Sequence, residues 1–111
     1  MISIEKRDKI DVINFTVDKI NALVTEDLRD EIGKVFQNGS NKVVINLAGV
    51  KYIDSSGFGC LLSIMKTARN NYCSIKFASP EPGVMEVLKT LNLHTVFDIY
   101  EDLDECVRSL R

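Results

Sequence analysis

The sequence of 111 residues contains no long apolar run. No stretch approaches the roughly 20 consecutive apolar residues that a membrane-spanning helix needs. The N-terminal segment, MISIEKRDKI, also lacks the apolar centre of a secretory signal peptide. We therefore expect no membrane insertion and a cytoplasmic location.

Basic residues are too few and too scattered to form a nucleic-acid-binding surface. The chain has 14 lysines and arginines against 16 aspartates and glutamates, a formal net charge of −2. No basic block is long enough to neutralise a row of phosphates, so nucleic acid is not expected as a partner.

The content of 45% hydrophobic and 27% charged residues is ordinary for a soluble protein, and we expect residues 1–111 to form one domain.

Cysteine is scarce and lacks the spacing of a paired or metal-binding site. Cys60, Cys73 and Cys106 lie far apart, show no CxxC spacing and are odd in number. Such a pattern fits a disulfide framework poorly. We interpret the three cysteines as buried free thiols that pack like small apolar residues, and we expect no metal and no cofactor.

Hydrophobic periodicity predicts strands and helices along most of the chain. Residues 2–7 and 10–17 alternate around Asp8 and Lys9, which predicts an opening hairpin. Thr25 is placed to cap the first helix, whose apolar positions share one face. Further strands are expected at 42–47, 73–78 and 96–100, and further helices after residue 54, after residue 80 and at the C-terminus.

The expected order of elements is β-β-α-β-α-β-α-β-α. Strands that alternate with helices of this length favour parallel pairing through right-handed crossovers, after an antiparallel hairpin. The near-continuous apolar run KVVINL (42–47) is typical of a strand covered on both faces. The fold class is therefore predicted as α/β, with a mixed, mostly parallel sheet and helices packed on it.

The segment YIDSSGFG (52–59) joins the strand at 42–47 to the second helix. Asp54 is suited to be the N-cap, with Ser55 and Ser56 as the first helical residues and their hydroxyls near the surface. Glycine within a helix lowers helix stability by about 1 kcal/mol relative to alanine, so the presence of Gly57 and Gly59 in one turn indicates a structural or functional role. We expect both glycines to leave open space around the two hydroxyls.

Several roles for this junction remain open. It can be simply a well-capped helix with small residues for close packing. A phosphate-binding loop is disfavoured because GxxxxGK[ST] is absent. A serine nucleophile is disfavoured because GxSxG is absent, and the only histidine, His94, would have to converge with Asp54 on Ser55 or Ser56. The remaining role is that of a substrate, a serine hydroxyl that another protein phosphorylates.

The second helix has an unusually wide apolar arc. Phe58 and Leu62 belong to this arc, which spans roughly 200°, wider than the roughly 100° that one-sided burial requires. The helix is therefore either packed on most of its circumference or keeps apolar surface for a partner.

The chain resembles the STAS domains, especially the bacterial anti-sigma factor antagonists. The resemblance rests on D-S-S-G-x-G (Asp54 to Gly59) after the VVINL strand and the GVKYI connection. It continues through ASPEPGVMEVLKTLNLHTVFDIYEDLDECVRSL and covers residues from about 10 to the end. It implies a STAS-like fold and a protein that acts by binding rather than as an enzyme.

The resemblance further implies control by partner switching. In the family, the serine after the motif aspartate is phosphorylated by an anti-sigma factor that is itself a serine kinase, and a protein phosphatase resets it. Carried onto this chain, the acceptor is Ser55, with Ser56 less favoured. The residues implied in partner binding are Asp54, Ser55, Ser56, Gly57, Phe58, Gly59, Leu62 and Asn21.

One position departs from the family pattern. Many members carry G-x-L-D before the first helix, whereas the aligned residues here are Asp18, Lys19, Ile20 and Asn21. Asn21 retains hydrogen-bonding capacity but lacks the carboxylate charge. An alternative within the same fold is a STAS subunit of a transporter or other multiprotein complex, which binds an ATPase partner without phosphorylation.

Overall fold

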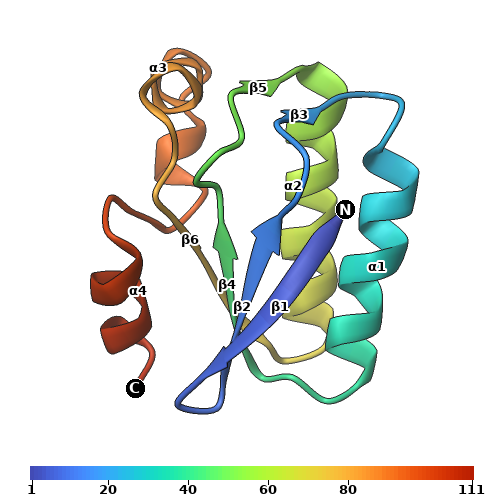
Figure 1. Cartoon of the computed structure of the whole chain (residues 1–111), viewed down its shortest axis with the longest axis vertical. Helices are drawn as coiled ribbons and strands as arrows, with labels where there is room; N and C mark the ends of the chain where they lie inside the picture. The colour runs from blue at the N-terminus through green and yellow to red at the C-terminus, as the bar shows by residue number, and fades with distance from the viewer.

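A five-stranded mixed sheet lies between two layers of helices (Figure 1). The structure is a computed structural model that describes all residues from 1 to 111. The strand order is β1-β2-β4-β6-β7, with β1 and β2 antiparallel and every later pair parallel. The strands of this sheet are β1 (Ile2–Arg7), β2 (Ile10–Phe15), β4 (Lys42–Asn46), β6 (Ser74–Ala78) and β7 (Ile99–Tyr100). The predicted α/β class is confirmed.

Four α-helices and one short 3₁₀ helix accompany the strands. Helices α1 and α2 lie side by side on one face of the sheet, and α4 lies on the other (Figure 1). Their bounds are α1 (Thr25–Gln37), α2 (Ser55–Asn70), α3 (Pro82–Thr90), η1 (Leu93–Thr95) and α4 (Leu103–Ser109). None of these helices is long and apolar enough to cross a membrane.

The sheet separates two apolar clusters. The larger cluster of 22 buried residues lies on the face covered by α1 and α2 and also includes Val84 and Leu88 of α3. The smaller cluster of 7 lies beneath α4. Residues Val43, Val44 and Ile45 of β4 are all fully buried, which confirms the prediction of a strand covered on both faces.

The opening hairpin forms as predicted. Asp8 and Lys9 have φ angles of 50° and 67°, and two consecutive residues with positive φ are what a tight hairpin turn with the right-handed strand twist requires. The second strand ends at Phe15, two residues earlier than the predicted 17.

The predicted helix cap at Thr25 is wrong. Thr25 is the first helical residue, Val24 occupies the N-cap position, and no side chain caps this helix. The Thr25 side chain is buried, and its hydroxyl donates to the carbonyl of Ala22 at 3.5 Å instead of accepting from a free helical N–H.

A second, small sheet was not predicted. It pairs β3 (Lys19–Ile20) with β5 (Tyr52–Ile53) in parallel. Two residues are too few to show an alternating pattern, so no periodicity could reveal them. The last predicted strand, 96–100, is likewise reduced to Ile99 and Tyr100, because the N–H groups of Val96 and Phe97 both donate to the carbonyl of Leu93 and continue the turn that follows η1.

Candidate functional site

The start of α2 is anchored by Asp54. The Asp54 carboxylate accepts a hydrogen bond from the Gly57 N–H at 2.8 Å, which confirms it as the N-cap. The backbone N–H of Asp54 donates to the carbonyl of Ile20 at 3.2 Å. The first turn of α2 is therefore fixed both by its own cap and by the small β3–β5 sheet.

Ser55 and Ser56 occupy the first two helical positions, and both are exposed. Neither hydroxyl forms a hydrogen bond with another side chain or with the backbone of the chain. The prediction that both hydroxyls lie at the surface is confirmed. The arrangement presents two free hydroxyls at the positive end of a helix dipole, where added negative charge is tolerated.

The two glycines of the motif have different surroundings. A Cβ on Gly57 would lie 2.4 Å from the carbonyl oxygen of Ile20 and 2.6 Å from Cγ2 of Ile53. Gly57 is thus required for close packing of α2 on the small sheet, and the expectation that it leaves open space is wrong. A Cβ on Gly59 would meet no atom within 4 Å, so the space expected around Gly59 is present.

The wide apolar arc of α2 is explained mostly by packing within the chain. Seven α2 residues are buried, and Phe58 among them is only 5% exposed. Helix α1 covers one side and the sheet covers another. Leu62 is half-buried and lies at the edge of this packed surface. Of the two open alternatives, packing on most of the circumference is the one observed.

Asn21 shapes the turn between β3 and α1. Its side-chain oxygen accepts from the N–H of Leu23 at 3.0 Å, and its carbonyl accepts from the N–H of Val24 at 3.1 Å. This is an Asx turn, in which a side-chain oxygen replaces a backbone acceptor. The turn needs an acceptor oxygen but no charge, so an amide and a carboxylate can serve equally.

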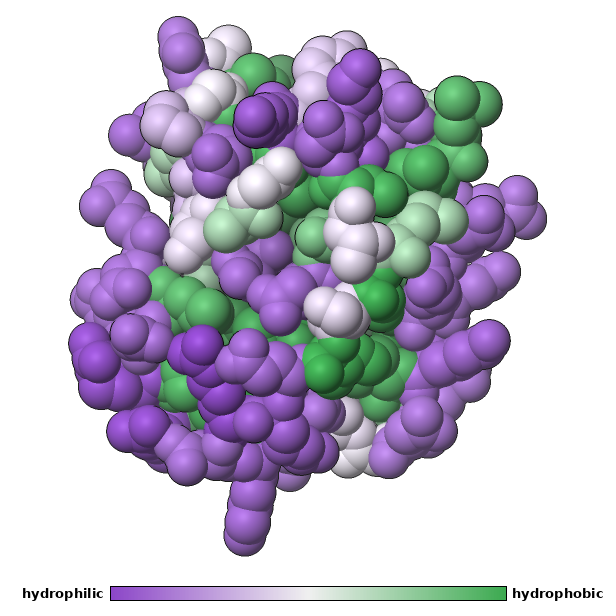
Figure 2. All heavy atoms as spheres, in the orientation of Figure 1, coloured by the Kyte–Doolittle hydropathy of each residue, from purple (hydrophilic) through white to green (hydrophobic).

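Two exposed apolar side chains near this turn were missed by the sequence reasoning. Leu23 is 89% exposed, and Tyr52 of β5 is 55% exposed. Figure 2 shows apolar atoms at the upper right of this face, over the connection from β3 to α1. Hydropathy alone predicts burial for Leu23 and is indecisive for Tyr52, so it did not mark either residue as exposed.

The geometry does not assemble a catalytic triad. His94 lies in η1 and is exposed, and no hydrogen bond joins it to Ser55, Ser56 or Asp54. The Asp54 carboxylate is already used at the Gly57 N–H. The three cysteines are free and buried, as predicted.

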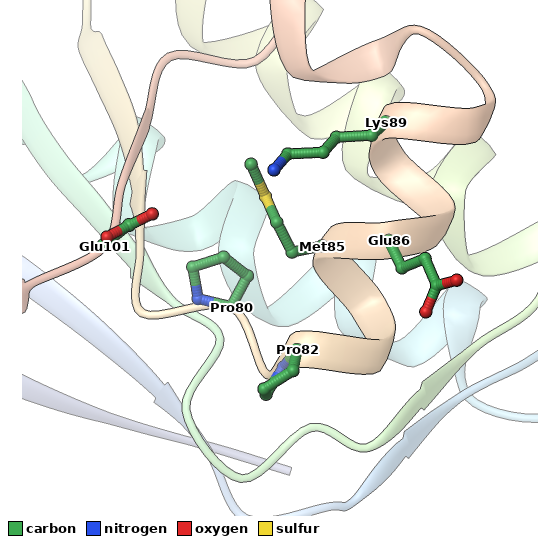
Figure 3. Close-up of a pocket in the computed structure, with 6 residues that line it drawn as sticks. All are labelled: Pro80, Pro82, Met85, Glu86, Lys89 and Glu101. Atoms are coloured by element: carbon green, nitrogen blue, oxygen red, sulfur yellow. The ribbon is translucent and has the colours of Figure 1, made fainter.

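The largest hollow lies apart from the serines. It has a volume of about 440 Å³ and is bounded by α3 and the connections next to it. In Figure 3, Pro80 and Met85 face one another across the hollow, Lys89 lies beside Met85, and Glu86 points away. None of the predicted site residues lines it; the six lining residues are Pro80, Pro82, Met85, Glu86, Lys89 and Glu101.

Residues 1–106 match the family described as STAS domain, and the chain belongs to this family. Relatives of the chain by sequence and by structure are described as anti-sigma factor antagonists, and membership of the STAS family agrees with the prediction that the chain is not an enzyme.

Two relatives from Thermotoga maritima resemble this chain, one in sequence and one in structure. A Thermotoga maritima protein named as a candidate anti-sigma factor antagonist is 30% identical over 73 residues, which are 66% of this chain and 65% of that protein. The chain therefore matches somewhat less than two thirds of that relative's length. A Thermotoga maritima crystal structure with the same description superposes with a TM-score of 0.86 at 22% identity, covering 97% of this chain and 92% of the other.

A further structural relative exists in two chemical states. The anti-sigma factor antagonist SpoIIAA in its unphosphorylated form superposes with a TM-score of 0.80 at 19% identity, covering 100% of this chain and 96% of the other. The Bacillus cell fate determinant SpoIIAA in its phosphorylated form gives 0.73 at 18% identity, with full coverage of both chains. At these identities the likeness establishes the shared fold.

Proposed function

We propose that this chain is an anti-sigma factor antagonist that works by partner switching. In its unphosphorylated form it binds an anti-sigma factor with serine kinase activity, and phosphorylation of Ser55 releases that partner. A protein phosphatase restores the binding form. The observation that supports this most directly is the free, exposed Ser55 hydroxyl on a helix start that Asp54 caps and the β3–β5 sheet holds.

The surroundings of Ser55 suit an acceptor of phosphate. Gly59 lies one turn further along α2 and has no atom near the position of a Cβ, so a partner can approach this turn closely. Asn21 forms the neighbouring turn that exposes Leu23, and it belongs to the proposed binding surface through that turn. Gly57 and Phe58 are buried, and they support the surface from beneath.

Phosphate on Ser55 would change the surface rather than the fold. It adds about −1.5 to −2 charge, and the helix dipole favours that charge at the first turn of α2. Release would then follow from repulsion by acidic groups at the interface and from the cost of desolvating the phosphate. This requires no unfolding of α2.

A binding measurement with matched variants tests the proposed function. The anti-sigma factor kinase of the same organism is titrated with the wild-type chain, with the chain phosphorylated on Ser55, and with Ser56→Ala. We expect binding by the wild type and by Ser56→Ala, and at least a tenfold weaker affinity after phosphorylation. Equal affinity of the two wild-type forms would refute partner switching, and no binding at all would favour a subunit role in another complex.

A further inference from the structure

Strand β1 is an open edge of the main sheet. It pairs with β2 over its full length and has no strand on its other side. Figure 1 shows it as the dark-blue strand drawn in front of β2. The opposite edge, β7, is only two residues long. An open strand of six residues is a template for pairing with another chain.

The backbone geometry identifies which groups point outward. The N–H of Thr16 donates to the carbonyl of Met1 at 2.7 Å. In an antiparallel ladder, alternate residues direct both polar groups to the same neighbour. The odd-numbered residues of β1 therefore direct their backbone N–H and C=O groups toward β2. Ile2, Ile4 and Lys6 direct theirs away from the sheet.

The charges on β1 do not block this edge. Lys6 is bound to Asp11 at 3.2 Å. Arg7 is bound to Glu5 and, at 2.9 Å, to Asp104. Edge strands are commonly protected by free charges, but here each charged side chain has a partner within the chain.

An apolar side chain lies at the middle of the open strand. Ile4 is 52% exposed, although it faces the same side of the sheet as α1. It borders a hollow of about 200 Å³ that Val35 of α1 also lines. Helix α1 thus leaves part of this strand uncovered, beside outward backbone groups that need hydrogen-bond partners.

We propose that β1 pairs antiparallel with β1 of a second copy of this chain, with Ile4 opposite Ile4 of that copy. The outward groups of Ile4 then bond to those of its equivalent, and the groups of Ile2 bond to those of Lys6 in the second copy. The two sheets become continuous. This inference does not depend on the proposed function, because β1 contributes no residue to the Ser55 site.

Symmetry and charge select this register. In an antiparallel twofold pair, residues that face α1 must lie opposite residues that face α1, so only shifts by two residues are allowed. A register shifted by two residues toward the C-terminal end of β1 places Glu5 directly opposite Glu5 of the second copy. Like charges in that position repel. A register shifted by two residues toward the N-terminal end leaves more of the outward backbone N–H and C=O groups without a partner in the second copy. The Ile4 register joins an apolar pair and places Glu5 opposite Ser3.

Sedimentation of the full chain over a series of concentrations tests the association. We expect the average mass of the wild type to rise toward that of two chains. Ile4→Pro should remain monomeric with a melting temperature close to the wild type, because the Ile4 N–H points outward and proline removes no bond to β2. Ile4→Lys serves the same purpose if the proline variant does not fold. A wild-type chain that stays monomeric throughout the series would overturn the proposal.

Single cysteines test the register. Opposed Cα atoms in this pair are about 5.5 Å apart, within disulfide range, whereas residues displaced by two positions are about 8 Å apart. Under oxidation, Ile4→Cys should form a covalent dimer, and Ser3→Cys and Glu5→Cys should not. The native thiols are buried, so the wild type should form none. Preferential crosslinking of Ser3→Cys or Glu5→Cys would overturn the proposed pairing.

Discussion

Gly57 and Gly59 lie on the same turn of α2 but differ in what surrounds them. The position of a Cβ on Gly57 is occupied by the Ile20 carbonyl and the Ile53 side chain, whereas that on Gly59 is open. Glycine lowers helix stability by about 1 kcal/mol relative to alanine. At Gly57 this cost is offset by the close approach of α2 to the small sheet, and at Gly59 no contact within the chain offsets it.

Alanine at each glycine should therefore have opposite effects. We expect Gly57→Ala to lower the free energy of unfolding by about 1–3 kcal/mol, as overpacking does. Gly59→Ala, the matched control, should raise it by up to about 1 kcal/mol through helix propensity. Urea denaturation of the two variants measures both values. A Gly57→Ala chain as stable as the wild type would show that the contact with Ile20 is not close.

Asn21 illustrates why an unusual residue need not change the structure. Its oxygen accepts from the Leu23 N–H, and a carboxylate could do the same. Asn21→Asp should therefore keep stability within about 0.5 kcal/mol, whereas Asn21→Ala should lose about 1 kcal/mol with the lost hydrogen bond. Guanidinium denaturation compares them. Equal losses for both variants would argue that the amide group itself is needed.

At the scale of the helix, Asp54 and Ser55 determine how α2 begins. Asp54 satisfies one of the free N–H groups, and Ser55 follows at the first helical position. Asp54→Ala should lower the free energy of unfolding by about 0.5–2 kcal/mol because the cap is lost. Thermal unfolding measures this, with Asp102→Ala at the start of the short helix α4 as a comparison in which the carboxylate also accepts a backbone N–H.

A negative charge at Ser55 should leave α2 folded. The helix dipole stabilises an anion at this end, so Ser55→Asp and the phosphorylated chain should show the circular dichroism of the wild type. A large loss of helical signal in either form would mean that control acts by unfolding α2 and not at the interface.

Elements with strong periodicity were predictable, and short ones were not. The hairpin, the buried strand β4 and the helix start at Asp54 follow from local patterns that the tertiary structure preserves. The pairing of β3 with β5 depends on contacts between residues about thirty positions apart, which no local pattern contains. The same pairing places Ile20 and Ile53 against Gly57, so the packing role of Gly57 could not be predicted from the sequence either.

At the scale of the whole molecule, the two apolar clusters together bury all three thiols. Cys60 and Cys73 belong to the larger cluster and Cys106 to the smaller one. Burial raises the pKa of Cys60, and it raises the pKa of Cys73 and of Cys106 from 9.0 to about 11. At a pH between these two pKa values, the thiols of the folded chain stay protonated, whereas the same thiols in the unfolded chain have lost their protons.

Stability should therefore fall in alkaline solution. The contribution of the protonated thiols is fully present below pH 9, the pKa of the unfolded thiol, and is lost as the pH rises toward 11. Urea denaturation at pH 8, 9, 10 and 11 under reducing conditions measures the decline. The Cys73→Ala, Cys106→Ala double variant should decline less steeply, and an identical slope would assign the pH dependence to other groups.

The location of phosphate on the chain decides between a switch at Ser55 and the other roles of this helix start. The measurement is mass spectrometry of the chain purified from its own host with phosphatases inhibited, followed by peptide mapping of residues 52–66. We predict phosphate on Ser55, none on Ser56, and none on the same peptide of Ser55→Ala. A chain that carries no phosphate under inducing and non-inducing conditions, or carries it on Ser56 alone, would contradict the proposed switch.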